Sequence, residues 1–108
     1  MGLPITITPA PGRWRVEAGG TILGETEAAL LLEEAGYPAR LYLPREDLDM
    51  TRLVPLPRHT TCPWKGEASY FAFAGLREVA WSYEAPIEGV AAIAGHLCFM
   101  PNVRVERV

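Results

Sequence analysis

The chain has 108 residues, 49% of them hydrophobic and 21% charged, which is typical of one folded domain and excludes a wholly disordered chain. Its formal net charge of −3 argues against the basic surface that nucleic acids and anionic membranes require. No apolar run approaches the roughly 18 residues that span a bilayer, and residues 1–5 carry no secretory signal. We therefore expect a cytoplasmic domain over residues 1–108, with no nucleic-acid and no membrane partner.

The first elements read as an arm and a hairpin. Residues 1–12 are rich in proline and are expected to form an extended N-terminal arm. In residues 13–18, charged and apolar side chains alternate, which indicates a half-buried strand. Gly19 and Gly20 can turn the chain, so that residues 21–23 return as the second strand of a hairpin.

The next stretch is less regular. Residues 25–34 favour a helix by propensity, although a short apolar run between turn signals can equally be a buried strand. Residues 40–43 read as a strand, and residues 46–52 can form one helical turn. Pro55 and Pro57 are expected to interrupt regular structure before the next element.

From residue 68 the pattern becomes clearer. Residues 68–73 and 79–83 alternate, which predicts an antiparallel hairpin with aromatic cross-strand pairs. Residues 86–94 predict the one short helix, because apolar side chains recur at helical spacing after a proline suited to its first position. Residues 97–100 and 103–105 read as the last short strands. The fold class is therefore mostly β, a small sandwich or barrel-like domain with one short helix.

Residues 59–71 concentrate unlike reactive groups around a turn. Cys62 precedes Pro63, which holds it in an extended conformation, and the turn that ends at Gly66 brings Lys65 near the thiol. The charge of Lys65 would favour the thiolate, which is a nucleophile or a ligand, so we predict Cys62 and Lys65 as catalytic residues. The alternative is an inert, buried cysteine, the commonest fate of a free thiol.

Two further groups could complete a cleft around this turn. Tyr70, Trp81 and Tyr83 can share one face of the predicted hairpin as an aromatic wall that binds a ring, or they can be ordinary core residues. Arg45 and Asp47 follow a strand end, where binding loops usually lie, and Arg45 could clamp an anion. The alternative is a solvated loop with a local ion pair.

A metal site is a weaker hypothesis. His59, Cys62, His96 and Cys98 provide two nitrogens and two sulfurs, a permissible ligand set for zinc. Phosphate-binding glycine loops, His-Glu-x-x-His and Gly-x-Ser-x-Gly are absent from the sequence, so the large enzyme classes that they mark are not indicated. We predict no metal ligand and no cofactor.

Four blocks of the sequence resemble the bacterial family of domain of unknown function 427, which also carries a nucleotidyltransferase-like label. They are residues 42–48 (YLPREDL), 61–70 (TCPWKGEASY), 80–86 (AWSYEAP) and 93–99 (IAGHLCF). The resemblance implies a small, soluble, mostly β protein with a bent sheet of the Mss4-like class, and a strand rather than a helix over residues 25–33. It also implies that the seven predicted site residues occupy motif positions.

The same resemblance weakens two readings. Cys98 departs from the family pattern, which has a small apolar residue there, so a zinc site that uses Cys98 would be peculiar to this chain. Nucleotidyl transfer normally needs paired acidic metal ligands, and only Glu46, Asp47 and Asp49 could provide them.

The function predicted from the sequence is the binding or transformation of a small polar or anionic ligand. Its cleft would combine the loop of Arg45, the turn of Cys62 and the aromatic hairpin. Alternatives are a non-enzymatic module that recognises a protein or ligand, and a zinc-binding β domain. Whether the domain is an enzyme stays open, and a homodimer is compatible with a small β domain whose edge strands need cover.

Overall fold

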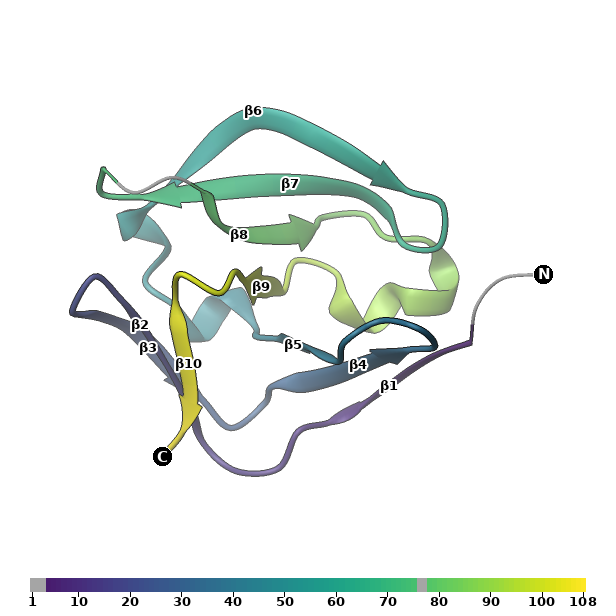
Figure 1. Cartoon of the computed structure of the whole chain (residues 1–108), viewed down its shortest axis with the longest axis horizontal. Helices are drawn as coiled ribbons and strands as arrows, with labels where there is room; N and C mark the ends of the chain where they lie inside the picture. Colours follow the sequence, from purple (N-terminus) through teal and green to yellow (C-terminus); the bar gives the residue numbers. More distant parts are fainter. Residues whose placement is uncertain (1–3, 76–77) are drawn as a thin grey trace.

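The computed structural model describes residues 4–75 and 78–108, and in this part of the chain it is mostly β (Figure 1). The strands form three antiparallel sheets, in the orders β1-β4-β5, β10-β2-β3 and β6-β7-β8-β9. The strands are β1 (Ile5–Pro9), β2 (Trp14–Ala18), β3 (Thr21–Thr26), β4 (Leu30–Glu34), β5 (Arg40–Tyr42), β6 (Leu53–Cys62), β7 (Gly66–Phe73), β8 (Glu78–Tyr83), β9 (Leu97–Phe99) and β10 (Arg104–Arg107). The short 3-10 helices are η1 (Arg45–Asp47), η2 (Met50–Arg52) and η3 (Glu88–Ile93).

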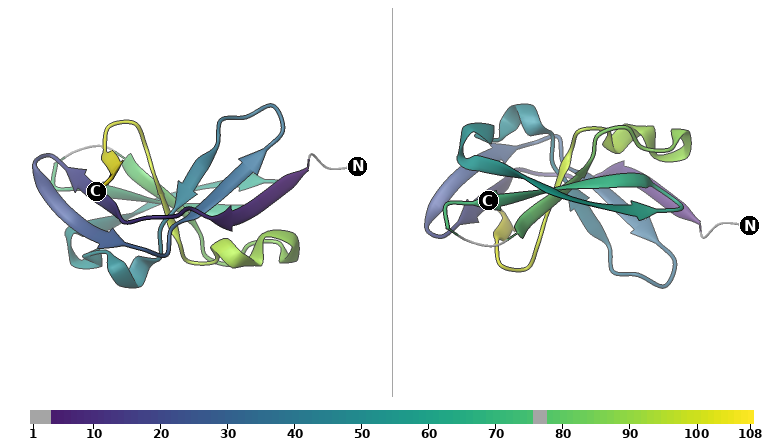
Figure 2. Two further views of the ribbon diagram at one scale, coloured as in Figure 1. Left: turned by 90° about the horizontal axis from the view of Figure 1, so that it is seen from below. Right: turned by 90° about the horizontal axis from the view of Figure 1, so that it is seen from above.

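Two of the sheets join into one bent surface. Leu43 and Leu97 exchange two backbone hydrogen bonds of 2.8 Å, which connect the β5 edge of one sheet to the β9 edge of the other. The long strands β6 and β7 lie on one side of the molecule and β1 and β4 on the other, with the bend between them (Figures 1 and 2). The sheet is open at its outer edges and does not close into a barrel.

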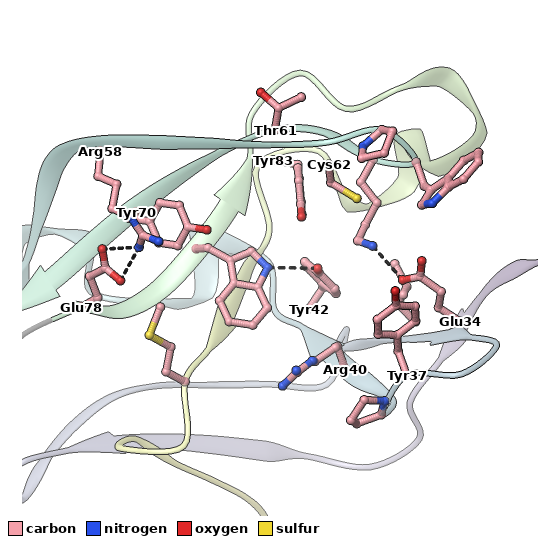
Figure 3. Close-up of a pocket in the computed structure, with 17 residues that line it drawn as sticks. Glu34, Tyr37, Arg40, Tyr42, Arg58, Thr61, Cys62, Tyr70, Glu78 and Tyr83 are labelled. Carbon is pink, nitrogen blue, oxygen red and sulfur yellow. Dashed lines mark hydrogen bonds and ion pairs between the residues drawn. The ribbon is translucent and has the colours of Figure 1, made fainter. Parts of the chain in front are cut away.

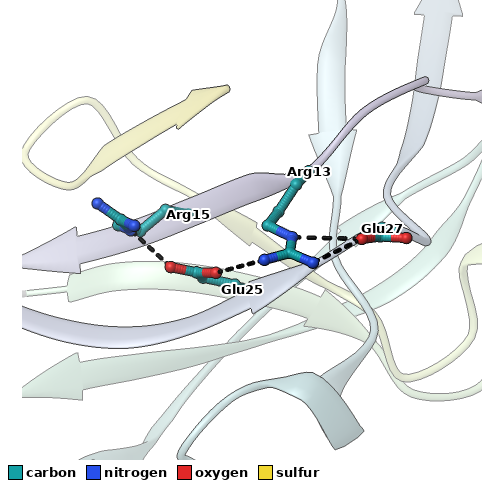
Figure 4. A network of polar contacts seen from close by, with 4 residues as sticks. All are labelled: Arg13, Arg15, Glu25 and Glu27. Atoms are coloured by element: carbon teal, nitrogen blue, oxygen red, sulfur yellow. Dashed lines mark hydrogen bonds and ion pairs between the residues drawn. The ribbon is translucent and has the colours of Figure 1, made fainter. Parts of the chain in front are cut away.

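The third sheet contains the predicted hairpin. β2 and β3 pair as expected from the alternation of residues 13–18, with a turn at Gly19 and Gly20. On the solvent side of this hairpin, four charged side chains form a network of ion pairs (Figure 4). Its members are Arg13, Arg15, Glu25 and Glu27. Such exposed pairs contribute little to stability.

The apolar side chains form two clusters. The larger one fills the space between the β10-β2-β3 sheet and one face of β7, β8 and β9. The second lies on the opposite face of β7 and β8, against β4 and β5, and it includes Leu32, Tyr42, Tyr83 and Ile93. This second cluster forms the base of the candidate site.

The helix favoured by propensity over residues 25–34 is wrong, and the strand implied by the family resemblance is confirmed. β3 continues to Thr26, and β4 begins at Leu30. β4 lies between β1 and β5, and Leu32 is buried. Pairing on both edges therefore outweighs the helix propensity of the leucines and glutamates.

The prediction that Pro55 and Pro57 interrupt regular structure is wrong. β6 runs through Pro55 and Pro57, because it is an edge strand and its pairing with β7 is interrupted between Pro55 and His59. Residues 5–9 within the predicted N-terminal arm form β1, which pairs along the whole of β4. Residues 1–3 of that arm lie outside the described residues.

The predicted helix at residues 86–94 is a 3-10 segment, η3, kinked at Val90. It begins at Glu88, two residues after the proline that was expected to start it. Val90 and Ile93 are buried while Ile87 is 46% exposed, so the buried positions are three apart, as suits a 3-10 helix. None of the helices in the described residues has the length and apolar character needed to cross a membrane.

Candidate functional site

A half-open pocket of about 630 Å³ lies on the concave side of the bent sheet, between β6, β7 and β8 on one side and β4 and β5 on the other (Figure 3). Seventeen residues line it, among them five of the seven site residues predicted from the sequence. These five are Cys62, Lys65, Tyr70, Trp81 and Tyr83. The volume is in the range of small-molecule sites, roughly 300–1,000 Å³.

The turn between β6 and β7 places two of these groups. The Lys65 N–H donates to the Cys62 carbonyl over 3.2 Å, which closes the turn. Gly66 follows with a φ of +117°, a conformation that L side chains rarely adopt. The Ile87 N–H donates to the Lys65 carbonyl over 2.9 Å and holds the turn against the start of η3. Cys62, a half-buried free thiol, and Lys65 are thereby fixed at one end of the pocket.

Lys65 forms a buried ion pair. Its Nζ lies 2.8 Å from Oε1 of Glu34 on β4, and the two side chains are only 11% and 8% exposed. The pair links the β6–β7 turn to the opposite side of the bend, so it holds the two walls of the pocket together (Figure 3). Removing one partner from such a pair leaves an uncompensated charge in a poorly solvated site.

The aromatic wall follows from strand pairing. Tyr70 on β7 is directly opposite Trp81 on β8, and Tyr83 is on the same face of β8 two residues further on. The indole N–H of Trp81 donates to the Tyr42 hydroxyl over 3.2 Å, across the bend. The Tyr42 and Tyr83 rings lie 6.5 Å apart, within the range of favourable aromatic pairs.

Tyr83 is a buried residue whose hydroxyl opens into the pocket. The residue is 6% exposed, and its side chain points into the pocket (Figure 3). Among the described residues no group forms a hydrogen bond with this hydroxyl. Burial raises the pKa of Tyr83 well above its usual value, so the phenol stays protonated and remains a hydrogen-bond donor. Burial likewise raises the pKa of Tyr42.

Three cations line the pocket, and they differ in what they bind. Arg58 is paired with Glu78 at 2.5 and 2.6 Å and packs over the Tyr70 ring at 4.3 Å. Lys65 is paired with Glu34. Arg40 is half-buried with its guanidinium 5.4 Å from the centre of the Trp81 ring. In residues 4–75 and 78–108 no acceptor takes a hydrogen bond from it.

Arg45 and Asp47 lie outside this pocket. Arg45 packs on the other face of β8, where it donates to the Gly95 carbonyl at 2.8 Å, to Ser82 at 3.3 Å and to Glu84 at 2.6 Å. Asp47 accepts a hydrogen bond of 2.8 Å from the Thr26 hydroxyl. Successive side chains of β8 point to opposite faces, which separates Ser82 and its arginine from Trp81 and Tyr83. The structure therefore does not bring the loop of Arg45 into the cleft as predicted.

The four residues of the zinc hypothesis do not converge. The His59 imidazole lies 3.5 Å from the Ser69 hydroxyl, and the His96 imidazole lies 3.2 Å from the Ala94 carbonyl. Burial raises the pKa of the Cys98 thiol to about 12, so this thiol stays protonated and apolar in character. No three His, Cys, Asp or Glu side chains in the described part of the chain are grouped so that they could hold a metal ion.

Sequence reasoning missed the polar residues that β4 and β5 contribute to the pocket, which are Glu34, Arg40 and Tyr42. Arg40 and Tyr42 are two apart on a strand and so point to one face, a signal that was readable in Arg40-Leu41-Tyr42. The β5 face that carries Arg40 and Tyr42 meets the β6–β8 wall because Leu43 and Leu97 form a β-bridge. The sequence has no local pattern that predicts this bridge.

The fold and the pocket define a small, mostly β domain built around an aromatic-walled cavity. The chain belongs to the family described as Domain of unknown function (DUF427), whose model matches residues 6–108. This match confirms the family resemblance of the four sequence blocks. No curated protein matches the chain.

Proposed function

We propose that the domain binds a small planar anion, a carboxylate or phosphate monoester on an aromatic body, in the pocket between β5 and the β6–β8 sheet. The observation that carries the proposal is Arg40. It is a half-buried guanidinium on the pocket wall that none of the described residues pairs or hydrogen-bonds. Arginine is the side chain best suited to bind carboxylate or phosphate through two parallel hydrogen bonds.

The charge balance of the pocket supports an anion. Glu34 neutralises Lys65, and Glu78 neutralises Arg58, so the remaining formal charge on the described lining is that of Arg40. A positive charge in a partly desolvated cleft attracts anions more strongly than the same charge on an open surface. The chain as a whole has a net negative charge, so the excess of positive charge is local to the pocket.

The walls support a planar body. Trp81, Tyr70 and Tyr83 lie on one side of the pocket, while Tyr37 and Trp64 lie at its rim, 62% and 40% exposed. Flat rings offer large apolar area at a low entropic cost, and they favour offset stacking with a planar ligand. The guanidinium of Arg40 over the Trp81 ring places the anion-binding group next to this surface.

The alternative of a protein-recognition module is less well supported. A surface that binds a folded partner presents its aromatic side chains outward. Here Tyr83 is 6% exposed and faces the cavity, and Trp81 donates a hydrogen bond inside it. A concave site for a small molecule fits these contacts better.

Calorimetric titration of three probes tests the proposal: benzoate, phenyl phosphate and, as an anion without a ring, acetate. We expect benzoate or phenyl phosphate to bind, acetate to bind more weakly, and Arg40→Ala to weaken ring-anion binding by about 10- to 100-fold, since the hydrogen bonds lost are to a charged group.

Arg104→Ala is the matched control, because Arg104 is an arginine on β10 whose side chain is 67% exposed and which does not line the pocket. It should bind the probes as the wild type does. Absence of binding of both ring probes to the wild type, or equal affinity for wild type and Arg40→Ala, would overturn the proposal.

A further inference from the structure

The end of the pocket beneath the β6–β7 turn places a thiol beside an unpartnered phenol. Cys62 and Tyr83 both line this end, and Cys62 is half-buried and free (Figure 3). A nucleophile and a donor therefore face the same volume.

The Tyr83 hydroxyl is the observation that points to a ligand atom. No fully buried side-chain N or O atom in the described residues lacks a partner, so the unpartnered Tyr83 hydroxyl must reach the open volume of the pocket. The Tyr83 residue is 6% exposed, and its hydroxyl faces the cavity. An oxygen of a bound molecule would supply the missing acceptor.

The geometry points to a site for carbonyl compounds, in which the Cys62 thiol adds reversibly to the carbonyl carbon of an anionic aldehyde while Tyr83 donates a hydrogen bond to the carbonyl oxygen. This inference rests on the proposed function, since Arg40 binds the anionic group of the same molecule. It narrows the ligand class from planar anions to planar anions that carry an electrophilic carbonyl.

The addition balances without a further reactant. The sulfur forms a bond to the carbonyl carbon, the π electron pair of the C=O bond moves to the oxygen, and the thiol proton ends on that oxygen. The product is a hemithioacetal, and no leaving group, oxidant or reductant takes part. A donor already aimed at the position where negative charge develops favours this step.

The other nucleophiles of the chain are less suitable. Lys65 is already engaged in the buried ion pair with Glu34, so attack by its amine would break that pair. Cys98 is buried and 2% exposed, and burial raises the pKa of its thiol to about 12. Of the two cysteines, Cys62 is the one that lines the described pocket, so its thiol is the one that a bound ligand can contact.

The test uses 4-carboxybenzaldehyde labelled with carbon-13 at the aldehyde carbon. Its ring and carboxylate match the proposed ligand class, and terephthalate, which lacks the aldehyde, is the non-reactive control. Carbon-13 NMR distinguishes the tetrahedral hemithioacetal carbon from the aldehyde and from an imine, while a sample without protein gives the hydrate background. We expect an adduct signal with the wild type that exceeds the signal with N-acetylcysteine at equal thiol concentration by at least about tenfold.

Three variants assign the groups. Cys62→Ser should remove the adduct signal, and Cys98→Ala should keep both the adduct and the affinity for terephthalate, because Cys98 does not line the pocket. Tyr83→Phe should lower the adduct equilibrium constant by about tenfold, the loss expected for one hydrogen bond. Tyr83→Phe keeps the aromatic ring, so we expect the variant to fold. Its denaturation curve checks this expectation.

The outcomes separate the two proposals. If terephthalate binds in an Arg40-dependent manner but no adduct forms, the carbonyl inference is wrong and the proposed function stands. If neither compound binds, both fail. An imine signal that disappears in Lys65→Met, or an adduct that persists in Cys62→Ser, would also overturn the assignment of the thiol.

Discussion

Arg40 and Arg45 are half-buried arginines on opposite faces of the bent sheet, and they have opposite surroundings. Arg45 donates three hydrogen bonds, to Gly95, Ser82 and Glu84. Arg40 is over the Trp81 ring, and the described residues offer it no acceptor. The sequence presents both as an arginine beside a short strand, so the residue type does not reveal the difference. A guanidinium with its donors satisfied stabilises the fold, whereas one with its donors free is available to a ligand.

The comparison extends to the two faces of β8. Ser82 faces Arg45 and is fully buried with its hydroxyl bonded, while Tyr83 faces the pocket with its hydroxyl free. Among the described residues, Arg45 and Ser82 on the first face are hydrogen-bonded, whereas the Arg40 guanidinium and the Tyr83 hydroxyl in the pocket have no acceptor. Variants on the first face should therefore change stability, and variants on the second should change binding.

The largest effect is expected from the buried ion pair between Lys65 and Glu34 in the pocket. Glu34→Gln removes the carboxylate and leaves the Lys65 ammonium in a site where it is 11% exposed. We expect the free energy of unfolding, measured by urea denaturation, to fall by about 3–5 kcal/mol. The double variant Glu34→Leu with Lys65→Met should recover most of this loss, because no buried charge remains. A loss below about 1 kcal/mol in Glu34→Gln would mean that water reaches the pair.

Alkaline pH should also weaken the fold. The pKa of the Cys98 thiol is raised to about 12 and those of Tyr42 and Tyr83 are raised above 10.0. Below pH 9 these groups are protonated in both the folded and the unfolded chain, and the free energy of unfolding is at its full value. It falls as the pH rises, because the unfolded chain releases these protons first. Denaturation at several pH values should show a fall of about 1.4 kcal/mol per pH unit for each group that is titrating. Tyr83→Phe should reduce the slope above pH 10; an unchanged slope would contradict the burial of this phenol.

Substitution of the two arginines should give the next largest change in stability. Arg45→Ala leaves Ser82 and the Gly95 carbonyl without their donor, and we expect a loss of about 2 kcal/mol in the free energy of unfolding. Arg40→Ala removes a side chain without a hydrogen bond in the described structure, so its effect should stay within about 0.5 kcal/mol. Equal losses for both would remove the distinction between a structural arginine and a ligand-binding one.

Tyr83→Phe should have the smallest effect on stability at neutral pH. The hydroxyl has no partner to lose among the described residues, so the free energy of unfolding should change by less than about 0.5 kcal/mol. A loss of more than 2 kcal/mol would show that the hydroxyl has a structural partner. The same variant tests the carbonyl site, so stability and reactivity are read from one protein.

The sequence predicted the parts of this architecture that depend on local patterns. Alternation in residues 68–73 and 79–83 gave β7 and β8, and it placed Tyr70, Trp81 and Tyr83 on one face. The turn between Cys62 and Gly66 follows from a proline and a glycine. These features need no knowledge of distant residues.

The parts that were missed depend on long-range pairing. The leucines of residues 30–34 favour a helix in isolation, but β1 and β5 pair with them on both sides. Arg45 was predicted as an anion clamp, but its acceptors are Gly95, Ser82 and Glu84, far along the chain. Arg40 was overlooked because its position over Trp81 exists only after the sheet bends. Residue type and spacing do not encode such partners.

NMR of the arginine Nε–H groups during a titration with benzoate tests the central claim most directly, because it observes both guanidinium groups in one experiment. Our account predicts that the Arg40 Nε–H signal shifts and exchanges more slowly with water as benzoate binds, while the Arg45 signal, already hydrogen-bonded to Gly95, stays in place. Titration that moves the Arg45 signal, or that moves only the exposed arginines and leaves Arg40 unchanged, would contradict it.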